Sequence, residues 1–337
     1  MYEALFSEPL KDTKVRCRIC PHNCLITPDK TGICRQRKNI EGKLYLLNYA
    51  RATSIHLDPI EKKPLYHFFP GKNILSLGTN GCNLACLFCQ NWTISQEDGE
   101  TEELTPEQAV ALAKQHKSFA IAYTYNEPLM WYEYVLDTAK LTRQAGLKNV
   151  LVTNGYINPE PLNQLMPYID ALNIDIKSMD DGFYHKLCKA RVNPVLETAK
   201  IARQTALVEI TNLVIPGEND TESNFKNLSQ WVAEHLGRDT PLHFSAYYPI
   251  YKLTNPPTPS DTLLKAHQIA KQYLDHVYLG NISLRETPVP ILSGSDTFCH
   301  KCQAKLIQRL GYNIKILKLT EDGQCGQCGA KNNIICR

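Results

Sequence analysis

The sequence has no excess of charge of one sign and no long hydrophobic run. Its 37 basic and 34 acidic residues leave a net charge of +3 over 337 residues, with both signs interspersed. Nucleic-acid binding would require clustered basic residues, so we expect no nucleic-acid partner. No run reaches the roughly 18 apolar residues of a membrane-spanning helix, and residues 1–11 lack the basic start and apolar core of a signal peptide. We therefore expect a cytoplasmic protein without a membrane partner.

The sequence also lacks the Ser/His/Asp set or paired carboxylates that acid–base or nucleophilic catalysis would use. Cysteine, in contrast, is abundant, with thirteen residues. In a reducing compartment, clustered cysteines more often bind metal than form disulfides. Eleven fall into three groups, which are Cys17, Cys20, Cys24 and Cys34, then Cys82, Cys86 and Cys89, then Cys299, Cys302, Cys325 and Cys328.

The middle of the chain alternates short apolar segments with stretches of helical length. The segments are residues 73–79, 119–124, 149–155, 171–177, 206–215 and 242–247. Six strand–helix units predict an α/β fold with a parallel sheet that curves into a partial or complete (β/α)6 barrel. A doubly wound open sheet is the alternative, but no Gly-x-Gly-x-x-Gly follows the first strand.

The domain prediction has three parts. Residues 1–70 form a cysteine-rich extension, residues 71–290 form the partial barrel, and residues 291–337 form a small four-cysteine module. The chemistry of such barrels lies at the carboxyl ends of the strands, and each predicted strand here ends at polar or otherwise special residues.

The sequence GCNLACLFCQNW places Cys82, Cys86 and Cys89 on one loop after the first predicted strand. Iron–sulfur clusters usually take four cysteines, so three thiolates can hold a cubane cluster and leave one iron open to a small ligand. A structural zinc knuckle that takes a fourth ligand from elsewhere is the alternative.

The spacing Cys-x3-Cys-x2-Cys, with Phe88 before the last cysteine, resembles the radical S-adenosylmethionine (SAM) enzymes. The resemblance implies a [4Fe-4S] cluster on these cysteines, with SAM chelating the open iron. It implies reductive cleavage of SAM to a 5′-deoxyadenosyl radical, which abstracts hydrogen from a substrate. The resemblance also places Phe88 next to the adenine.

Several strand ends match this family in part. Glu127 stands where the family meets the SAM amino group, although Tyr125 and Asn126 replace the usual glycines, so Asn126 is a SAM-site candidate of open role. Asp175 and Lys177 resemble the Asp-x-Lys of glycyl-radical-enzyme activases, where the lysine contacts the SAM carboxylate. A buried ion pair is the alternative for these two residues.

Weaker matches complete the predicted SAM site. Thr153 lies in a third-strand motif of the activases, but Val152 replaces the aspartate that helps to hold a cation in those enzymes. Ile215 lies in a segment whose backbone meets adenine in the family. Tyr251 falls where the activases keep a residue near the adenine.

Longer stretches resemble a narrower family. DPIEKKPLYHFFPG (58–71) together with GCNLACLFCQNW resembles the radical SAM component of the AmmeMemoRadiSam system, a relative of the pyruvate formate-lyase activating enzymes. The resemblance implies a low-potential electron donor of flavodoxin or ferredoxin type, and the other proteins of that system as partners. It leaves the substrate open, a polypeptide being one candidate.

The outer cysteine groups carry separate predictions. Cys299, Cys302, Cys325 and Cys328 have the paired spacing of a zinc ribbon or rubredoxin, with zinc favoured over iron, although Gln303 stands where a glycine is expected. Cys17, Cys20, Cys24 and Cys34 are less regular and are predicted to bind zinc, an auxiliary cluster or nothing. The alternative for the whole protein is a zinc-binding scaffold without catalysis.

Overall fold

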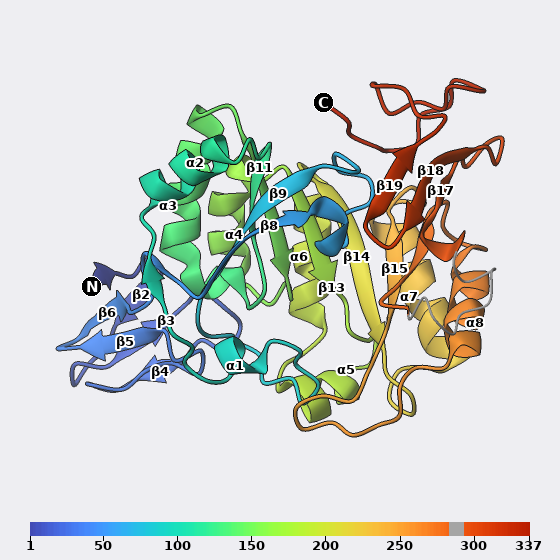
Figure 1. The fold of residues 1–337 in the computed structure, drawn as a ribbon. Coiled ribbons are helices and arrows are strands. Elements are labelled where there is room, and N and C mark those ends of the chain that lie inside the picture. The colour runs from blue at the N-terminus through green and yellow to red at the C-terminus, as the bar shows by residue number, and fades with distance from the viewer. Residues whose placement is uncertain (283–292) are drawn as a thin grey trace.

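The computed structural model describes residues 1–282 and 293–337. At its centre lies an eight-stranded mixed sheet (Figure 1). Its spatial order is β16 (Val277–Gly280), β15 (Leu242–Ala246), β14 (Leu207–Val214), β13 (Ala171–Asp175), β12 (Lys148–Thr153), β11 (Ala120–Tyr123), β9 (Asn73–Gly78) and β8 (Ser54–Pro59). Neighbouring strands from β9 to β16 are parallel, whereas β8 pairs antiparallel with β9.

This topology confirms the predicted α/β partial barrel. The six predicted strands correspond to β9 and β11 to β15. From β9 onward the strands follow chain order across the sheet, without the reversal of direction that defines a doubly wound sheet. Among the described residues β8 and β16 remain the two edges, so the sheet is open rather than closed. These two strands were not predicted, and β8 ends at Pro59, a residue that is unfavourable inside a strand.

Helices cover the outer face of the sheet (Figure 1). α2 (Pro106–Gln115) packs against β11, α3 (Tyr132–Gln144) against β11 and β12, α6 (Asn193–Arg203) against β14, and α8 (Ser260–Ala270) against β15 and β16. α7 (Glu222–His235) packs against α8, and α4 (Pro159–Leu165) packs against α6. α2 begins with a capping box, in which Gln108 N–H donates to Thr105 Oγ1 and Gln108 Oε1 accepts from Thr105 N–H.

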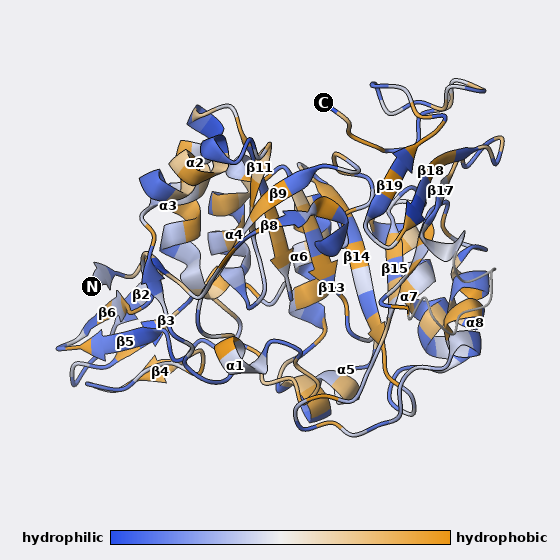
Figure 2. Cartoon of the chain, viewed as in Figure 1, coloured by the Kyte–Doolittle hydropathy of each residue, from blue (hydrophilic) through white to orange (hydrophobic). Residues whose placement is uncertain are grey.

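Short helices join these elements. They are α1 (Trp92–Ser95), α5 (Asp181–Phe183), the 3-10 turns η1 (Ile60–Lys62), η2 (Pro128–Trp131), η3 (Met166–Tyr168) and η5 (Ser293–Ser295), and the π-helical turn η4 (Tyr184–Cys188). The apolar strands and the inner helix faces form one main core, visible as orange segments in Figure 2. Removing this apolar surface from water, at about 25 cal/mol per Å², is the main force that holds the strand ends in place.

The N-terminal residues form small antiparallel sheets beside the barrel. One sheet contains β1 (Tyr2–Glu3), β6 (Lys43–Leu46) and β5 (Arg37–Ile40), another contains β2 (Ser7–Pro9), β3 (Val15–Cys17) and β4 (Leu25–Ile26), and β7 (Arg51–Ala52) pairs with β10 (Glu102–Glu103). A buried ion pair joins these sheets to α3, with Arg37 Nη2 at 2.7 Å from Glu133 Oε2. Glu133 Oε1 also accepts a 2.7 Å hydrogen bond from Leu5 N–H.

The C-terminal residues form a third unit, with an antiparallel sheet of β17 (Thr297–Phe298), β18 (Lys305–Leu310) and β19 (Asn313–Ile316). Its own core is small, consisting of five buried residues. The last residues return to the barrel, where Ile335 pairs with Phe68 and its N–H donates to the His67 carbonyl at 2.8 Å. The boundary expected near residue 70 stays a prediction, and β8 lies on its N-terminal side; the boundary expected near 290 lies outside the described residues.

Candidate metal and cofactor site

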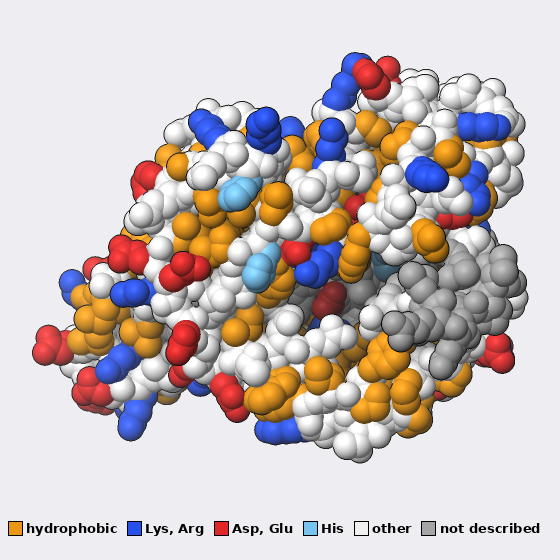
Figure 3. All heavy atoms as spheres, viewed as in Figure 1, with side chains coloured by type: hydrophobic (Ala, Val, Ile, Leu, Met, Phe, Trp, Pro, Cys, Tyr) orange, Lys and Arg blue, Asp and Glu red, His pale blue; other side chains and the backbone are white. Residues whose placement is uncertain are grey.

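A cavity of about 780 Å³ opens at the carboxyl ends of the parallel strands. Figure 3 shows the molecule hollowed near the centre of this face, with charged side chains of both signs around the hollow. The predicted site residues that line it are Cys82, Cys86, Phe88, Cys89, Asn126, Glu127, Thr153, Asp175 and Lys177. Residues from three predicted strand ends and the cysteine loop are therefore brought together.

The cysteine loop leaves β9 through Gly81, whose φ of +94° suits glycine. A Cβ at this position would lie 2.5 Å from Gln36 Cγ, so any side chain here would clash with the N-terminal unit. Two backbone hydrogen bonds of 3.0 Å attach the loop to η4, from Ala85 N–H to the Cys188 carbonyl and from Leu87 N–H to the Leu187 carbonyl. The loop is thus fixed from both sides.

Polar groups of the protein contact each sulfur of the loop. Leu84 N–H donates to Cys82 Sγ at 3.4 Å, and Ser95 Oγ lies 3.1 Å from Cys89 Sγ. The Cys188 thiol donates to Cys86, and this hydrogen bond is the main reason that the pKa of Cys86 is lowered. Cys188 ends η4 and is fully buried.

Glu127 lies at the end of β11, where its carboxylate is held by three protein donors. Thr153 Oγ1 and Leu129 N–H donate to Oε1 at 2.8 and 3.1 Å, and Asn154 N–H donates to Oε2 at 2.8 Å. An ionised carboxylate has about four acceptor positions, so one remains for a ligand. Burial raises the pKa of Glu127 to about 7 even though these donors favour the charged form.

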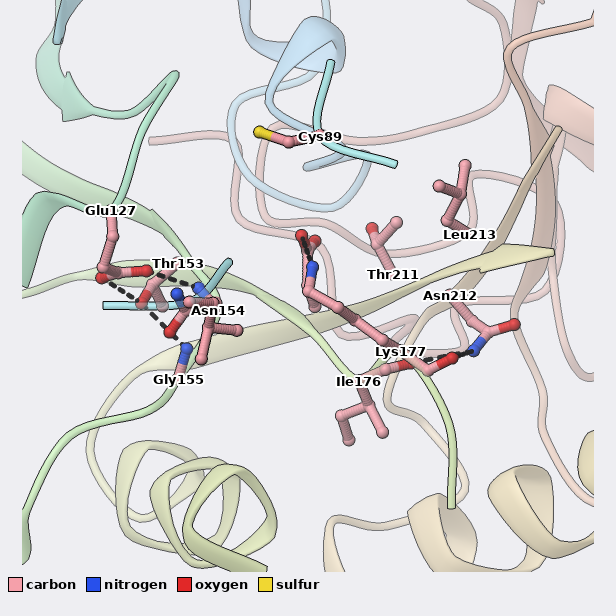
Figure 4. A network of polar contacts seen from close by, with 12 residues as sticks. Cys89, Glu127, Thr153, Asn154, Gly155, Ile176, Lys177, Thr211, Asn212 and Leu213 are labelled. Carbon is pink, nitrogen blue, oxygen red and sulfur yellow. Dashed lines mark hydrogen bonds and ion pairs between the residues drawn. The ribbon is translucent and has the colours of Figure 1, made fainter. Parts of the chain in front are cut away.

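Figure 4 shows Glu127 and Lys177 on opposite sides of a gap, with Cys89 above it in this view. Lys177 Nζ lies 2.9 Å from Asp175 Oδ2, so the predicted ion pair is present. Burial disfavours the charged lysine, but Asp175 and Cys86 outweigh it and hold the pKa of Lys177 well above its usual value. Because both side chains line the cavity, the SAM-binding role remains a prediction beside the ion pair.

Asn126 has both ends of its amide group occupied by the protein. Its Nδ2 donates to the Gly81 carbonyl at 2.7 Å, and its Oδ1 accepts from Thr79 N–H at 3.3 Å. Asn126 therefore connects the end of β9 to the start of the cysteine loop. It also borders the cavity, so its predicted contact with the cofactor is not tested by this geometry.

Two of the predicted residues are not among those that line the cavity. Ile215 is fully buried, and its N–H donates to Asn219 Oδ1 at 2.6 Å. Tyr251 stacks on Trp92 with ring centroids 5.3 Å apart. Phe88, in contrast, borders the cavity, with Lys177 Nζ 6.0 Å from its ring centroid. The roles of Ile215 and Tyr251 next to adenine stay predictions.

Sequence reasoning missed Asn154, whose side chain bridges two elements of the site. Its Nδ2 lies 3.6 Å from Cys82 Sγ and donates to Asn83 Oδ1 at 3.0 Å. An Asn–Gly pair at a strand end is a turn signal and gives no sign of such a contact.

The stretch DPIEKKPLYHFFPG, to which no role was assigned from the sequence, forms another wall of the cavity. Lys63 Nζ pairs with Asp58 Oδ2 at 2.6 Å, and the Tyr125 hydroxyl donates to the same carboxylate. The Lys63 ammonium also lies 4.3 Å from the Tyr125 ring centroid. Burial lowers the pKa of Lys63 to about 8. Asp58 and Lys63 of this stretch thus form a buried ion pair.

A histidine–carboxylate pair also borders the cavity through its histidine. His243 on β15 borders the cavity, and its Nε2 lies 2.6 Å from Glu209 Oε2 on β14. Glu209 Oε1 accepts from His67 N–H at 2.7 Å. These residues are distant in sequence, so no local pattern could have paired them.

The C-terminal cysteines form a compact group, as the sequence predicts. The Sγ atoms of Cys299, Cys302, Cys325 and Cys328 all lie within 4.8 Å of one another. Cys299 Sγ is 3.6 Å from Cys328 Sγ, and Cys302 Sγ is 3.7 Å from Cys325 Sγ. Four sulfurs at 2.3 Å around one zinc ion would be about 3.8 Å apart. Gln303 adopts a φ of +58°, the conformation for which glycine was expected.

Comparisons with known proteins agree with this geometry. Residues 76–228 match the radical SAM superfamily. An uncharacterised protein of Methanocaldococcus jannaschii is 46% identical over 342 residues, covering 99% of this chain and 100% of that protein. The chain belongs to the radical SAM superfamily.

More distant relatives carry functional names. A pyruvate formate-lyase-activating enzyme of Clostridium pasteurianum is 23% identical, with 45% of this chain and 66% of that enzyme covered. The (2S)-3-sulfopropanediol dehydratase activating enzyme of Klebsiella oxytoca is 26% identical over 33% of this chain and 35% of that enzyme. Streptococcus suis SuiB shares the fold, with a TM-score of 0.52 at 13% identity, covering 66% of this chain and 52% of SuiB.

Membership in the radical SAM superfamily implies a [4Fe-4S] cluster and SAM, and the residues of this cavity fit both groups. Three thiols of the loop face one cavity, and their sulfur atoms do not form a group as compact as the four C-terminal sulfur atoms. Wider spacing suits a cluster, because its thiolates bind different irons. Glu127 keeps one acceptor position for an ammonium group, and Lys177 supplies a cation for a carboxylate. No helix in the described part of the chain has both the length and the hydropathy to cross a membrane.

Proposed function

We propose that the cavity binds a [4Fe-4S] cluster on Cys82, Cys86 and Cys89, and SAM between Glu127 and Lys177. The observation that carries this proposal is the position of the Glu127 carboxylate and the Lys177 ammonium on opposite sides of the gap below Cys89 (Figure 4). When bound, these groups supply a 5′-deoxyadenosyl radical that removes a hydrogen atom from a substrate.

The residues of this chain orient the cofactor and exclude water. Glu127 accepts from the amino group of SAM, and Lys177 donates to its carboxylate. Phe88, only 3% exposed, covers one side of the site. Low exposure around a reactive centre protects it from side reactions with solvent.

A polypeptide is the substrate that we propose. Named relatives are activating enzymes, and SuiB has also been solved bound to precursor peptide SuiA. The β18–β19 hairpin of this chain borders the cavity through Leu310 and Tyr312. Both are more than half exposed, as is unusual for large apolar side chains. An apolar rim continuous with a reactive cavity suits a segment of another chain.

The proposed partners follow from the same reasoning. Reductive cleavage requires one electron, so a flavodoxin or ferredoxin-like protein is the proposed donor. The other proteins of the AmmeMemoRadiSam system are the first candidates for the polypeptide substrate.

Substitution of a loop cysteine tests the cluster assignment. We expect Cys86→Ala to lose 5′-deoxyadenosine formation and about four irons per chain. Cys336→Ala is the matched control, because Cys336 is outside all three cysteine groups and should retain both properties. Cleavage of SAM that persists in Cys86→Ala would refute the assignment. A colourless wild-type protein that contains zinc alone would instead favour the scaffold alternative.

The substrate proposal has a separate test. Reduced enzyme and SAM are incubated with each candidate protein, followed by mass spectrometry and electron paramagnetic resonance (EPR). We expect faster 5′-deoxyadenosine release together with a mass change or radical on one protein, and a weaker effect for Tyr312→Ala. Stimulation by small molecules alone would exclude a polypeptide substrate.

A further inference from the structure

The N-terminal cysteines form a buried set beside the cysteine loop. Cys17, Cys20 and Cys34 are 5–6% exposed, and Cys24 is half-buried. They come from β3, from the turn that follows it and from the segment before β5. Each of Cys17, Cys20 and Cys34 lies close enough to others of the set for their charges to interact. The fold thus collects four thiols from eighteen residues of chain into one place.

Backbone amides donate to these sulfurs as they do in the other two cysteine groups. The amide two residues after the cysteine is the donor in each case, namely Ile19 to Cys17, His22 to Cys20 and Gln36 to Cys34. The same arrangement occurs at Cys82, Cys89 and Cys325, whose donors are Leu84, Asn91 and Gln327. Such amides stabilise a thiolate, which is the form that binds metal.

A buried arginine supplies a second observation. Arg37 is 0% exposed, and its charge interacts with Cys17 and Cys34. Its two terminal nitrogens bond to Glu133 and the Leu5 carbonyl, but Nε has no hydrogen-bond partner among the described residues. A buried donor without a partner costs about 1–3 kcal/mol. An anionic group bound between the thiols would give it an acceptor.

The spacing of the thiols distinguishes between metals. All four C-terminal sulfurs lie within 4.8 Å of one another, whereas the N-terminal sulfurs form no group that is compact enough for a single metal ion. One zinc ion draws its sulfurs to about 3.8 Å from one another. Four thiolates that each bind a different iron of a cubane cluster stand further apart. The N-terminal set therefore suits a cluster, and the C-terminal set suits a single ion.

The segment that carries the N-terminal cysteines also contacts the cysteine loop directly. His22, two residues after Cys20, places Nε2 at 2.8 Å from the Asn83 carbonyl, next to Cys82. A Cβ on Gly81 would lie 2.7 Å from the Cys34 carbonyl oxygen. The segment of the N-terminal cysteines thus packs against the backbone of residues 81–83, where the cysteine loop begins.

We propose that Cys17, Cys20, Cys24 and Cys34 hold a second [4Fe-4S] cluster that lies against the loop of the first. Half-buried Cys24 gives this cluster a side near solvent. A low-potential one-electron donor would lose one electron here, and the same electron would reduce the neighbouring cluster, with no bond made or broken. The site goes beyond the proposed function and is tested without SAM.

The decisive variant removes the first cluster from the full chain. C82A/C86A/C89A, reconstituted without oxygen, should remain brown and contain about four irons and about four acid-labile sulfides per chain. Sulfide is measured because a single iron at the C-terminal site would add iron but no sulfide. The matched control is Cys336→Ala, which should contain about eight sulfides. Sulfide near zero in the triple variant, or zinc at the N-terminal set, would overturn the proposal.

The position is tested by EPR of the reduced protein. Two neighbouring paramagnetic clusters broaden each other's signals, so the wild-type spectrum should differ from the sum of two single-cluster spectra. These come from the triple variant and from C20A/C34A. A wild-type spectrum equal to that sum would refute the adjacent placement. If C20A/C34A does not fold, faster relaxation in the wild type than in the triple variant gives the same test. Failure of SAM cleavage would leave these readouts unchanged, so the two proposals fail separately.

Discussion

Glu127 shows how burial and hydrogen bonding oppose each other at a single residue. Burial raises its pKa to about 7, and the hydrogen bonds from Asn154, Thr153 and Leu129 lower it by less. A raised carboxyl pKa means that the folded protein binds this proton more tightly than the unfolded chain. The contribution of Glu127 to the free energy of unfolding therefore falls as pH rises from about 4.5 to about 7, and it is constant above about pH 7.

The same carboxyl predicts a pH dependence of SAM binding. An ionised Glu127 attracts the SAM ammonium, so we expect affinity to rise between about pH 6 and about pH 8. Glu127→Gln should bind SAM at least tenfold more weakly, with a shallower pH dependence than the wild type. It should also be less stable by about 1–3 kcal/mol, because an amide N–H would face a protein donor. Calorimetric titration across this range measures the affinity, and urea titration measures the stability. Parallel pH profiles of the affinity would exclude a role for the carboxylate.

For single residues, the sequence predicted the contacts between residues that are close together in the chain or that end neighbouring strands. The spacing of Cys82, Cys86 and Cys89 predicted one loop, and the strand ends predicted that Glu127 and Lys177 would share a cavity. The contacts of Asn154 with Cys82 and of Cys188 with Cys86 were not predictable, because each joins residues distant in sequence.

Among the elements, the C-terminal sheet is the one that we expect to depend most on a bound ion. Its buried core has only five residues, which is too few for a stable unit of this size. Yet its Arg309 donates to the Tyr66 carbonyl at 2.8 Å, and Leu310 to Tyr312 border the cavity. Loss of the ion should therefore lower the stability of the protein more than it changes the cavity.

Cys325→Ala tests this order. We expect a lower melting temperature and loss of one zinc or iron per chain, with the cluster iron and sulfide retained. Differential scanning fluorimetry and metal analysis make the measurement, with Cys336→Ala as the control. An unchanged melting temperature together with lost cluster sulfide would contradict the structural role of the site.

The elements were predicted well where apolar segments alternate with stretches of helical length. The six apolar segments became strands. β8 and β16 were missed, and in β8 the polar residues and the terminal Pro59 weaken the strand pattern. The pairing of β7 with β10, across about 50 residues, has no local signal at all.

For the whole molecule, the pair of Arg37 and Glu133 joins the N-terminal sheets to the barrel. Both side chains are 1% exposed. Removing one partner of a buried pair leaves an uncompensated charge and typically costs about 3–5 kcal/mol. We expect Glu133→Gln to lower the free energy of unfolding by about this amount and to loosen the N-terminal unit.

The matched control is Glu197→Gln, which breaks the exposed pair of Glu197 and Lys200. Exposed pairs contribute about 0–1 kcal/mol, so this variant should unfold almost like the wild type. Urea titration of both variants makes the comparison. Equal stabilities for the two variants would show that the buried pair does not hold the units together.

Assembly at this largest scale was the least predictable from sequence. The three cysteine groups were recognised separately, but the placement of Cys34 against Gly81 arises only when the N-terminal sheets dock on the barrel. Long-range packing of this kind leaves no periodic trace in the chain.

The central claim is that the three-cysteine cluster keeps one iron for SAM. It is tested most directly by EPR of the anaerobically reduced protein before and after addition of SAM. We predict that SAM changes the cluster signal, that 5′-deoxyadenosine then appears, and that neither occurs in Cys86→Ala. A wild-type cluster signal that stays unchanged at saturating SAM would contradict the account.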